Sequence, residues 1–221
     1  MIVPELPEQF LVEFVPRYFA ELTARKAPAS DAGGGQSDGG GRRSGRSPAP
    51  VGVLVRVVGS GEWTLRLVAD RLEVTPGVAL DVALAISLLA RDFAPLVVEP
   101  VRRALAAAAS EGGVAKTSAA AANGIWARLG RWDEETVDLL RRQTGRILVR
   151  VDDLGTSRNV ALTPGAQAFS LEEAECSIQC ELADLYELQA KRKNPLDLFY
   201  EGQIRITGDA QIALAMAGLF L

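Results

Sequence analysis

The sequence predicts an α+β fold in which one order of helices and strands occurs twice. Apolar and polar residues alternate with the period of two that β-strands require, once within 53–86 and again within 146–181. A segment with helical periodicity precedes each block, and a helix that begins near an Asp follows each one. The 221 residues suffice for one large or two small domains, and a hydrophobic content of 48% can fill a sizeable core.

The first half begins with a predicted amphipathic helix over 8–25, which Pro16 is expected to kink. Residues 27–50 are rich in Gly, Ser, Pro and Arg, so they cannot bury a core and are expected to be a disordered linker. The strands predicted next are 53–58, 63–68, 71–75 and 80–86, followed by a helix over 89–109, disturbed by Pro95 and Pro100, and an Ala-rich helix over 117–129.

The second half repeats this order from a helix that starts at Asp133 and ends near Gly145. Its predicted strands are 146–152, 159–163, 166–171 and 174–181, followed by a helix over 184–191. Thr-Pro-Gly occurs in both halves, at 75–77 and 163–165, and Asp92 matches Asp184. These matches indicate an internal duplication, with chance similarity of two α+β stretches as the alternative.

The composition argues against several kinds of chemistry. The chain has no His, which removes the commonest general base, the Ser-His and Cys-His pairs, and most zinc and haem sites. Its net charge of −4 argues against nucleic acid as a partner. Cys176 and Cys180 lie four residues apart on one strand, too far for a disulfide, and are expected to be small buried hydrophobes. No catalytic residue, metal or cofactor is expected.

Two other patterns carry weak functional signals. Residues 112–118 resemble a phosphate-binding loop, but Ala115 replaces a Gly and a helix rather than a strand precedes it, so nucleotide binding is not expected. The cations of 191–193 suit a helix C-terminus; the alternative is transient contact with an anionic membrane surface. No signal peptide or spanning helix is visible, so a soluble cytoplasmic protein is expected.

The C-terminal segment carries the most informative pattern. It contains Asn194-Pro195, Phe199, Gly202, an Ile-Arg-Ile strand at 204–206 and Gly208-Asp209, and it ends in an almost wholly apolar stretch over 210–221. A helix that is apolar all round is buried, inserted in a membrane or closing an apolar cavity. This stretch is too short to span a bilayer.

In this order the segment resembles the sterol carrier protein type 2 (sterol-binding) family. The resemblance implies a five-stranded, mostly antiparallel sheet covered by helices, with an apolar tunnel between sheet and helices. The first half looks like a degenerate copy, so the chain is expected to be an intramolecular pseudo-dimer. The expected parts are the N-terminal helix of copy one at 1–26, the linker at 27–50, the degenerate copy at 51–110, a helical connector at 111–132 and the complete domain at 133–221.

The resemblance further implies non-enzymatic binding or transfer of a fatty acyl chain, sterol or other lipid. The alternative is an interaction or scaffold protein of a lipid, quinone or polyketide pathway with a filled core. Residues predicted to line a tunnel are apolar, and each has plain core as its alternative, because lining and core look identical in sequence. They are Ile178, Cys180, Leu185, Leu188, Leu198, Phe199, Ile204, Ile206, Ile212, Met216 and Leu219. The sequence leaves the oligomeric state open.

Overall fold

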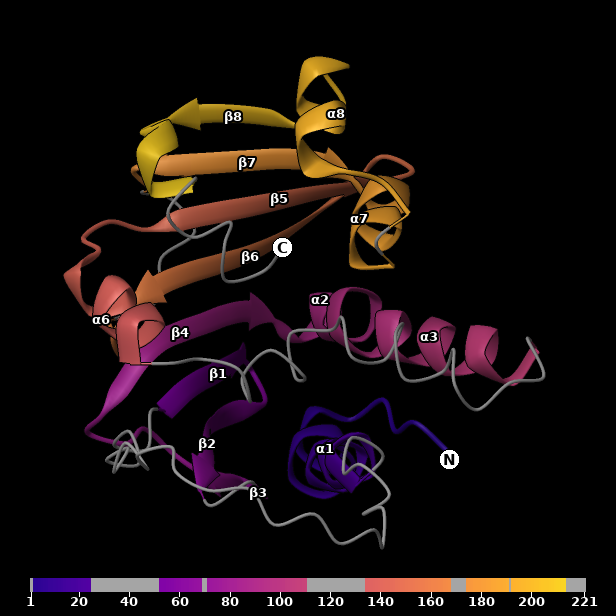
Figure 1. Ribbon diagram of the computed structural model, residues 1–221, viewed down its shortest axis with the longest axis vertical. Helices are drawn as coiled ribbons and strands as arrows, with labels where there is room; N and C mark the ends of the chain where they lie inside the picture. Colours follow the sequence, from indigo (N-terminus) through magenta and orange to yellow (C-terminus); the bar gives the residue numbers. More distant parts are fainter. Residues whose placement is uncertain are drawn as a thin grey trace, which may run out of the picture.

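The computed structural model describes residues 2–24, 52–68, 71–110, 134–167, 174–190 and 192–213 (Figure 1). The strands are β1 (Gly52–Val58), β2 (Gly61–Val68), β3 (Arg71–Pro76), β4 (Val82–Leu89), β5 (Ile147–Asp153), β6 (Thr156–Pro164), β7 (Cys176–Glu181) and β8 (Arg205–Gly208). The helices are α1 (Val15–Ala24), α2 (Ala90–Phe93), α3 (Glu99–Ser110), α6 (Glu134–Arg142), α7 (Leu182–Gln189) and α8 (Pro195–Tyr200). The predicted linker, the connector at 111–132 and most of the strand at 166–171 lie outside the described residues.

Both long helical segments of the first half contain a π-helical turn at or next to a proline. A π-helical turn, η1 (Gln9–Phe14), leads into α1 just before Pro16, and another, η2 (Ala94–Val98), contains Pro95 and joins α2 to α3. Proline lacks the N–H that an α-helix needs, and the backbone pairing shifts locally to compensate. The predicted helix at 89–109 is therefore confirmed with its disturbance at Pro95, whereas Pro100 lies in the first turn of α3 and does not interrupt it.

The strands form one mixed sheet in the order β3-β2-β1-β4-β6-β5-β7-β8. Five of its seven ladders are antiparallel, while β1 with β4 and β5 with β7 are parallel. The α+β class and the predominance of antiparallel pairing are as predicted. The predicted five-stranded sheet is corrected to one of eight strands, four from each half of the chain.

Each half contributes a hairpin followed by a parallel strand. β1 and β2 form the first hairpin with β4 beside β1, and β5 and β6 form the second with β7 beside β5. Both parallel strands enter a helix through an extended residue, Leu89 or Glu181, and Asp92 and Asp184 then occupy the third helical position. The two Asp residues therefore occupy equivalent positions in the two halves. The two Thr-Pro-Gly sequences do not, because one ends β3, the third strand of its half, and the other ends β6, the second strand of its half.

The two halves join where β4 pairs with β6, from Leu84 opposite Pro164 to Leu88 opposite Val160. On the far side of β7 the second half adds β8, whereas β4 has no such partner from its own half. A free edge strand exposes unpaired N–H and C=O groups, and the β4–β6 ladder satisfies them on both halves. The halves consequently share a single sheet instead of forming two sheets.

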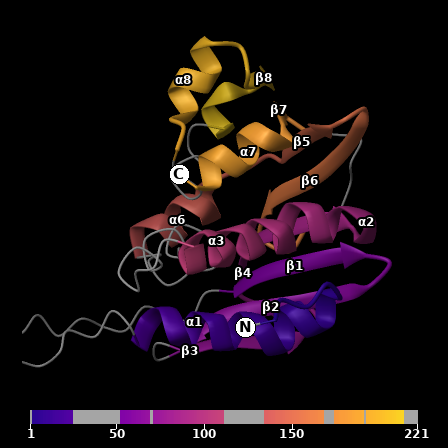
Figure 2. The same cartoon turned by 90° about the vertical axis from the view of Figure 1, so that its right-hand side faces the viewer.

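One face of this sheet is apolar across six of its eight strands. A row of six buried side chains runs across six of the strands, and each residue is the register partner of the next one. The row consists of Trp63, Val55, Ile86, Leu162, Ile147 and Cys176. Helices α1, α3 and α7 lie in front of the strands in Figure 2. Aromatic side chains of the N-terminal helix, Phe10 and Phe14, pack against this row together with Phe93. The N-terminal helix and α3 therefore bury this apolar face.

Candidate functional site

The apolar side chains beneath the helices form two clusters. The larger one lies under the N-terminal helix and α3. The smaller one, here named the C-terminal cluster, lies where strands β5 to β8 meet α7, α8 and the turn η2. Its buried members are Leu96, Val151, Cys180, Leu198 and Ile204, and its half-buried members are Val97, Val149, Val160, Ile178, Leu182, Leu185, Leu188 and Ile206. Several half-buried residues, such as Val97 and Ile178, also touch the larger cluster, so the two are continuous.

The C-terminal cluster brings together seven of the eleven residues that the sequence proposed as a lining: Ile178, Cys180, Leu185, Leu188, Leu198, Ile204 and Ile206. Ile212 is buried in the larger cluster instead. Phe199 lies outside both clusters, with its side chain 45% exposed and its ring packed edge-on against Tyr200. Met216 and Leu219 lie outside the described residues.

Sequence reasoning missed the members that come from the first half. Leu96 and Val97 follow Pro95 in an apolar run inside a predicted helix, and the β4–β6 junction places that helix beside the second half. Val151 was also missed, although its place in an alternating strand marked it as inward-facing.

The Asn-Pro and Gly positions shape the turn that buries Leu198. The Asn194 side chain accepts a hydrogen bond from the N–H of Leu196 at 2.9 Å, which caps α8, and Pro195 occupies the first helical position. After the helix the chain reverses at Gly202, whose φ of +74° favours glycine. The N–H of Ile204 then donates to the carbonyl of Leu198 at 3.1 Å, which places both side chains in the C-terminal cluster.

The Gly-Asp pair fixes the start of the final segment against the sheet. Gly208 has a φ of +85°, and a Cβ atom there would lie 2.1 Å from the carbonyl oxygen of Glu175. The next residue, Asp209, donates its N–H to that same oxygen at 2.8 Å, and its carboxylate accepts from the N–H of Gln211. Ile212 and Ala213 are thereby held in the larger cluster. The remainder of the predicted final helix, 214–221, lies outside the described residues.

The two cysteines are free and buried, as predicted. Burial raises the pKa of the Cys180 thiol to about 11, with Asp184 and Asp152 adding to the shift. Burial also raises the pKa of Cys176. Thiols that stay protonated at neutral pH are poor nucleophiles and behave as small apolar groups. Cys180 therefore contributes apolar surface to the C-terminal cluster.

Charged residues border the C-terminal cluster at the end where β4, β5 and β7 finish. Arg158 lies opposite Val151 in the β5–β6 ladder, and its Nη2 donates to Asp153 at 3.0 Å. Its Nη1 lies 3.6 Å from Oδ1 of Asp92, a carboxylate that is only 1% exposed. We name Asp92, Asp153 and Arg158 the polar end of the cluster.

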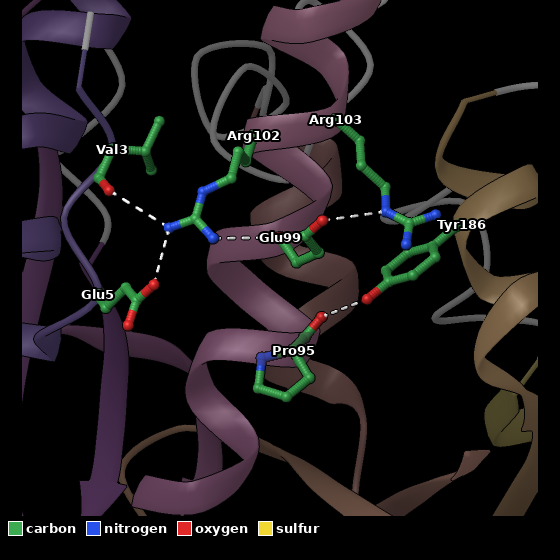
Figure 3. Close-up of polar contacts among 7 residues, drawn as sticks. All are labelled: Val3, Glu5, Pro95, Glu99, Arg102, Arg103 and Tyr186. Carbon is green, nitrogen blue, oxygen red and sulfur yellow. Dashed lines mark hydrogen bonds and ion pairs between the residues drawn. The ribbon is translucent and has the colours of Figure 1, made fainter. Parts of the chain in front are cut away.

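Helix α3 is held beside α7 by further polar contacts (Figure 3). The Tyr186 hydroxyl donates to the carbonyl of Pro95 at 2.9 Å, and the guanidinium of Arg103 lies 4.1 Å from the centre of the Tyr186 ring. Burial raises the pKa of Tyr186, so the hydroxyl stays a donor at neutral pH. Glu99 binds both Arg103 and Arg102, and Arg102 reaches Glu5. These contacts join the N-terminal segment, α3 and α7.

The cations at the end of α7 are already paired. Arg192 forms two contacts of 2.9 Å with Glu187, and Lys193 lies 2.8 Å from Asp184, which raises the pKa of Lys193. Lys191 lies outside the described residues. Within the described ranges, no helix is both long and apolar enough to cross a membrane, and no three His, Cys, Asp or Glu side chains are grouped to hold a metal ion.

The second half is thus an α+β unit in which helices close an apolar cluster against a sheet. Residues 127–221 match the model of the SCP-2 sterol transfer family, which confirms the family resemblance for this part of the chain. A comparison with curated protein sequences gave no match.

Solved sterol carrier proteins are loosely similar. Sterol carrier protein 2 like 2 from Aedes aegypti has 16% identity over 53% of this chain and 97% of its own, with a TM-score of 0.31. Its palmitated form has 19% identity over 42% of this chain and 85% of its own, with a TM-score of 0.33. Sterol carrier protein 2 from Yarrowia lipolytica, in the apo form, has 14% identity over 39% and 74%, with a TM-score of 0.31.

Proposed function

We propose that this protein binds a hydrophobic ligand at the C-terminal cluster and carries it without catalysing a reaction. The ligand would be a fatty acyl chain, a sterol or another lipid. Its apolar part would lie between the strands β5, β7 and β8 and the helices α7 and α8. The observation that carries the proposal is that most of the predicted lining residues meet in one cluster, inside the range that matches the family.

The chemistry of the C-terminal cluster supports binding by burial alone. Its members are aliphatic apart from Cys180, whose raised pKa keeps it neutral. Removing an alkyl chain from water is favourable by about 0.8 kcal/mol for each CH₂ group, so such a site needs no charged or catalytic group. Its half-buried members include Leu185 and Leu188 on α7, and we propose that a ligand enters on this side of the cluster.

A scaffold role is the second candidate, and the surface of α8 favours it. Leu196, Phe199 and Tyr200 share one side of this helix and are 56%, 45% and 82% exposed. Exposed apolar side chains gathered in one place are typical of contact surfaces between proteins. In this role the C-terminal cluster would be a filled core.

Two matched tryptophan variants test the carrier function. The neutral dye Nile red and dodecanol serve as probes, with dodecanol measured by displacement of the dye. Leu185→Trp adds bulk inside the C-terminal cluster, whereas Leu196→Trp adds the same bulk on the exposed side of α8. We expect Leu185→Trp to weaken dodecanol binding about tenfold or more and Leu196→Trp to leave it unchanged.

The result that contradicts the carrier function is failure of the unaltered protein to bind either probe at micromolar concentrations. Native mass spectrometry of the purified protein gives an independent readout, because a co-purified lipid adds a discrete mass. If the two variants weaken binding equally, the ligand does not occupy the C-terminal cluster.

A further inference from the structure

Two buried polar atoms at the polar end lack hydrogen bonds among the described residues. Asp92 accepts one hydrogen bond through Oδ2, from the N–H of Asn159 at 3.4 Å, but its Oδ1 has no partner within that range of the chain. Arg158 uses Nη2 for Asp153, while its Nε is buried and likewise unpaired. The 3.6 Å between Oδ1 and Nη1 is too long for a hydrogen bond. One free acceptor and one free donor therefore lie close together.

These two atoms lie where the polar end of a ligand would be placed. Arg158 is the cross-strand neighbour of Val151, which is fully buried in the C-terminal cluster. Asp92 precedes Leu96, another buried member, by about one helical turn. A lipid with its alkyl part in the cluster can therefore bring one end to Asp92 and Arg158. Exposure rises from 1% at Asp92 through 17% at Arg158 to 28% at Asp153, so this end also leads toward solvent.

The charges at the polar end favour an uncharged head group. The polar end holds two carboxylates, the buried Asp92 and the half-buried Asp153, against the single guanidinium of Arg158. Arg91 lies 3.9 Å from Asp92 but is 71% exposed, so water screens most of its charge. A carboxylate ligand could only accept hydrogen bonds, and it would add a negative charge beside Asp92.

A hydroxyl group fits both unpaired atoms. It has one O–H donor for Oδ1 of Asp92 and two lone pairs that can accept from Nε of Arg158. We propose that Asp92 and Arg158 bind the hydroxyl head group of an uncharged lipid and disfavour lipids that end in a carboxylate. This inference rests on the proposed function and adds to it the class of ligand.

The test compares two probes that share one alkyl chain, dodecanol and dodecanoate, by displacement of Nile red from the full chain at neutral pH. We expect the unaltered protein to bind dodecanol about tenfold or more tightly than dodecanoate. Asp92→Asn removes the charge but keeps an oxygen acceptor, so it should strengthen dodecanoate binding about tenfold and leave dodecanol binding within about threefold. Asp138→Asn, on the exposed surface of α6, is the matched control and should change neither affinity.

Asp153→Asn provides a second variant, because this carboxylate is partly exposed and its replacement is less disruptive to folding. Like Asp92→Asn, it should reduce the preference of the protein for dodecanol over dodecanoate. Equal affinities for the two probes in the unaltered protein, or a ratio that neither variant changes, would overturn the inference and leave the carrier function intact. Failure of both probes and of the dye to bind would overturn the carrier function and the inference together.

Discussion

Truncation of Leu198 to Ala is the most direct probe of the C-terminal cluster. Leu198 is 1% exposed and packs with Cys180 and Ile204, so its side chain is fully inside the protein. The change removes three carbons, which is worth about 2.4 kcal/mol of transfer free energy. The cavity left behind adds to this, because α8 is anchored at both ends by Asn194 and Gly202 and collapses incompletely. We expect the free energy of unfolding to fall by about 3 kcal/mol.

The control lies two residues away on the same helix. Leu196 is 56% exposed, and Leu196→Ala removes the same atoms while keeping the N–H that Asn194 caps. We expect this change to alter the free energy of unfolding by no more than about 0.5 kcal/mol. Urea denaturation followed by tryptophan fluorescence measures both variants. Equal, small losses for the two variants would show that Leu198 does not close the cluster, and the proposed position of the ligand would be wrong.

Three further predictions concern the Gly-Asp turn and the buried thiol. Gly208→Ala should lower the free energy of unfolding by about 2–4 kcal/mol, because its new Cβ would meet the Glu175 carbonyl. The control is Gly77→Ala, where φ is similar but the space around the residue is open, and it should lower the free energy of unfolding by about 1 kcal/mol. The same urea denaturation assay measures both variants. Burial raises the pKa of Cys180 from 9.0 to about 11, so folded protein binds more protons than unfolded protein between these values, and stability should fall as pH rises through this window. Alkylation of Cys180 by iodoacetamide at pH of about 8 should likewise be far slower in folded than in urea-unfolded protein, and equal rates would refute its burial.

Much of the candidate site follows from short stretches of sequence. Asn194-Pro195 caps a helix, Gly202 permits the reversal, and Gly208 permits a contact that a side chain would block. Each of these effects depends on a few neighbouring residues, so it can be recognised without knowledge of the fold. The alternation along a strand, which turns Ile178 and Cys180 to the opposite face from Gln179, also depends only on neighbouring residues. Which side of the short helix α8 faces inward was harder to predict. Phe199 was expected to face inward, but the turn of α8 that buries Leu198 leaves Phe199 outside.

The sequence by itself determined the α+β class, the repeated order of elements, the apolar character of both cysteines and the family resemblance of the C-terminal part. Only the tertiary structure decided that β4 pairs with β6, because the alternation along a strand specifies which side is buried but not which edge it will meet. That one pairing merges two halves into a single sheet and brings Leu96 into the C-terminal cluster. It also places Asp92 of the first half beside Arg158 of the second, a meeting of distant residues that no local pattern records.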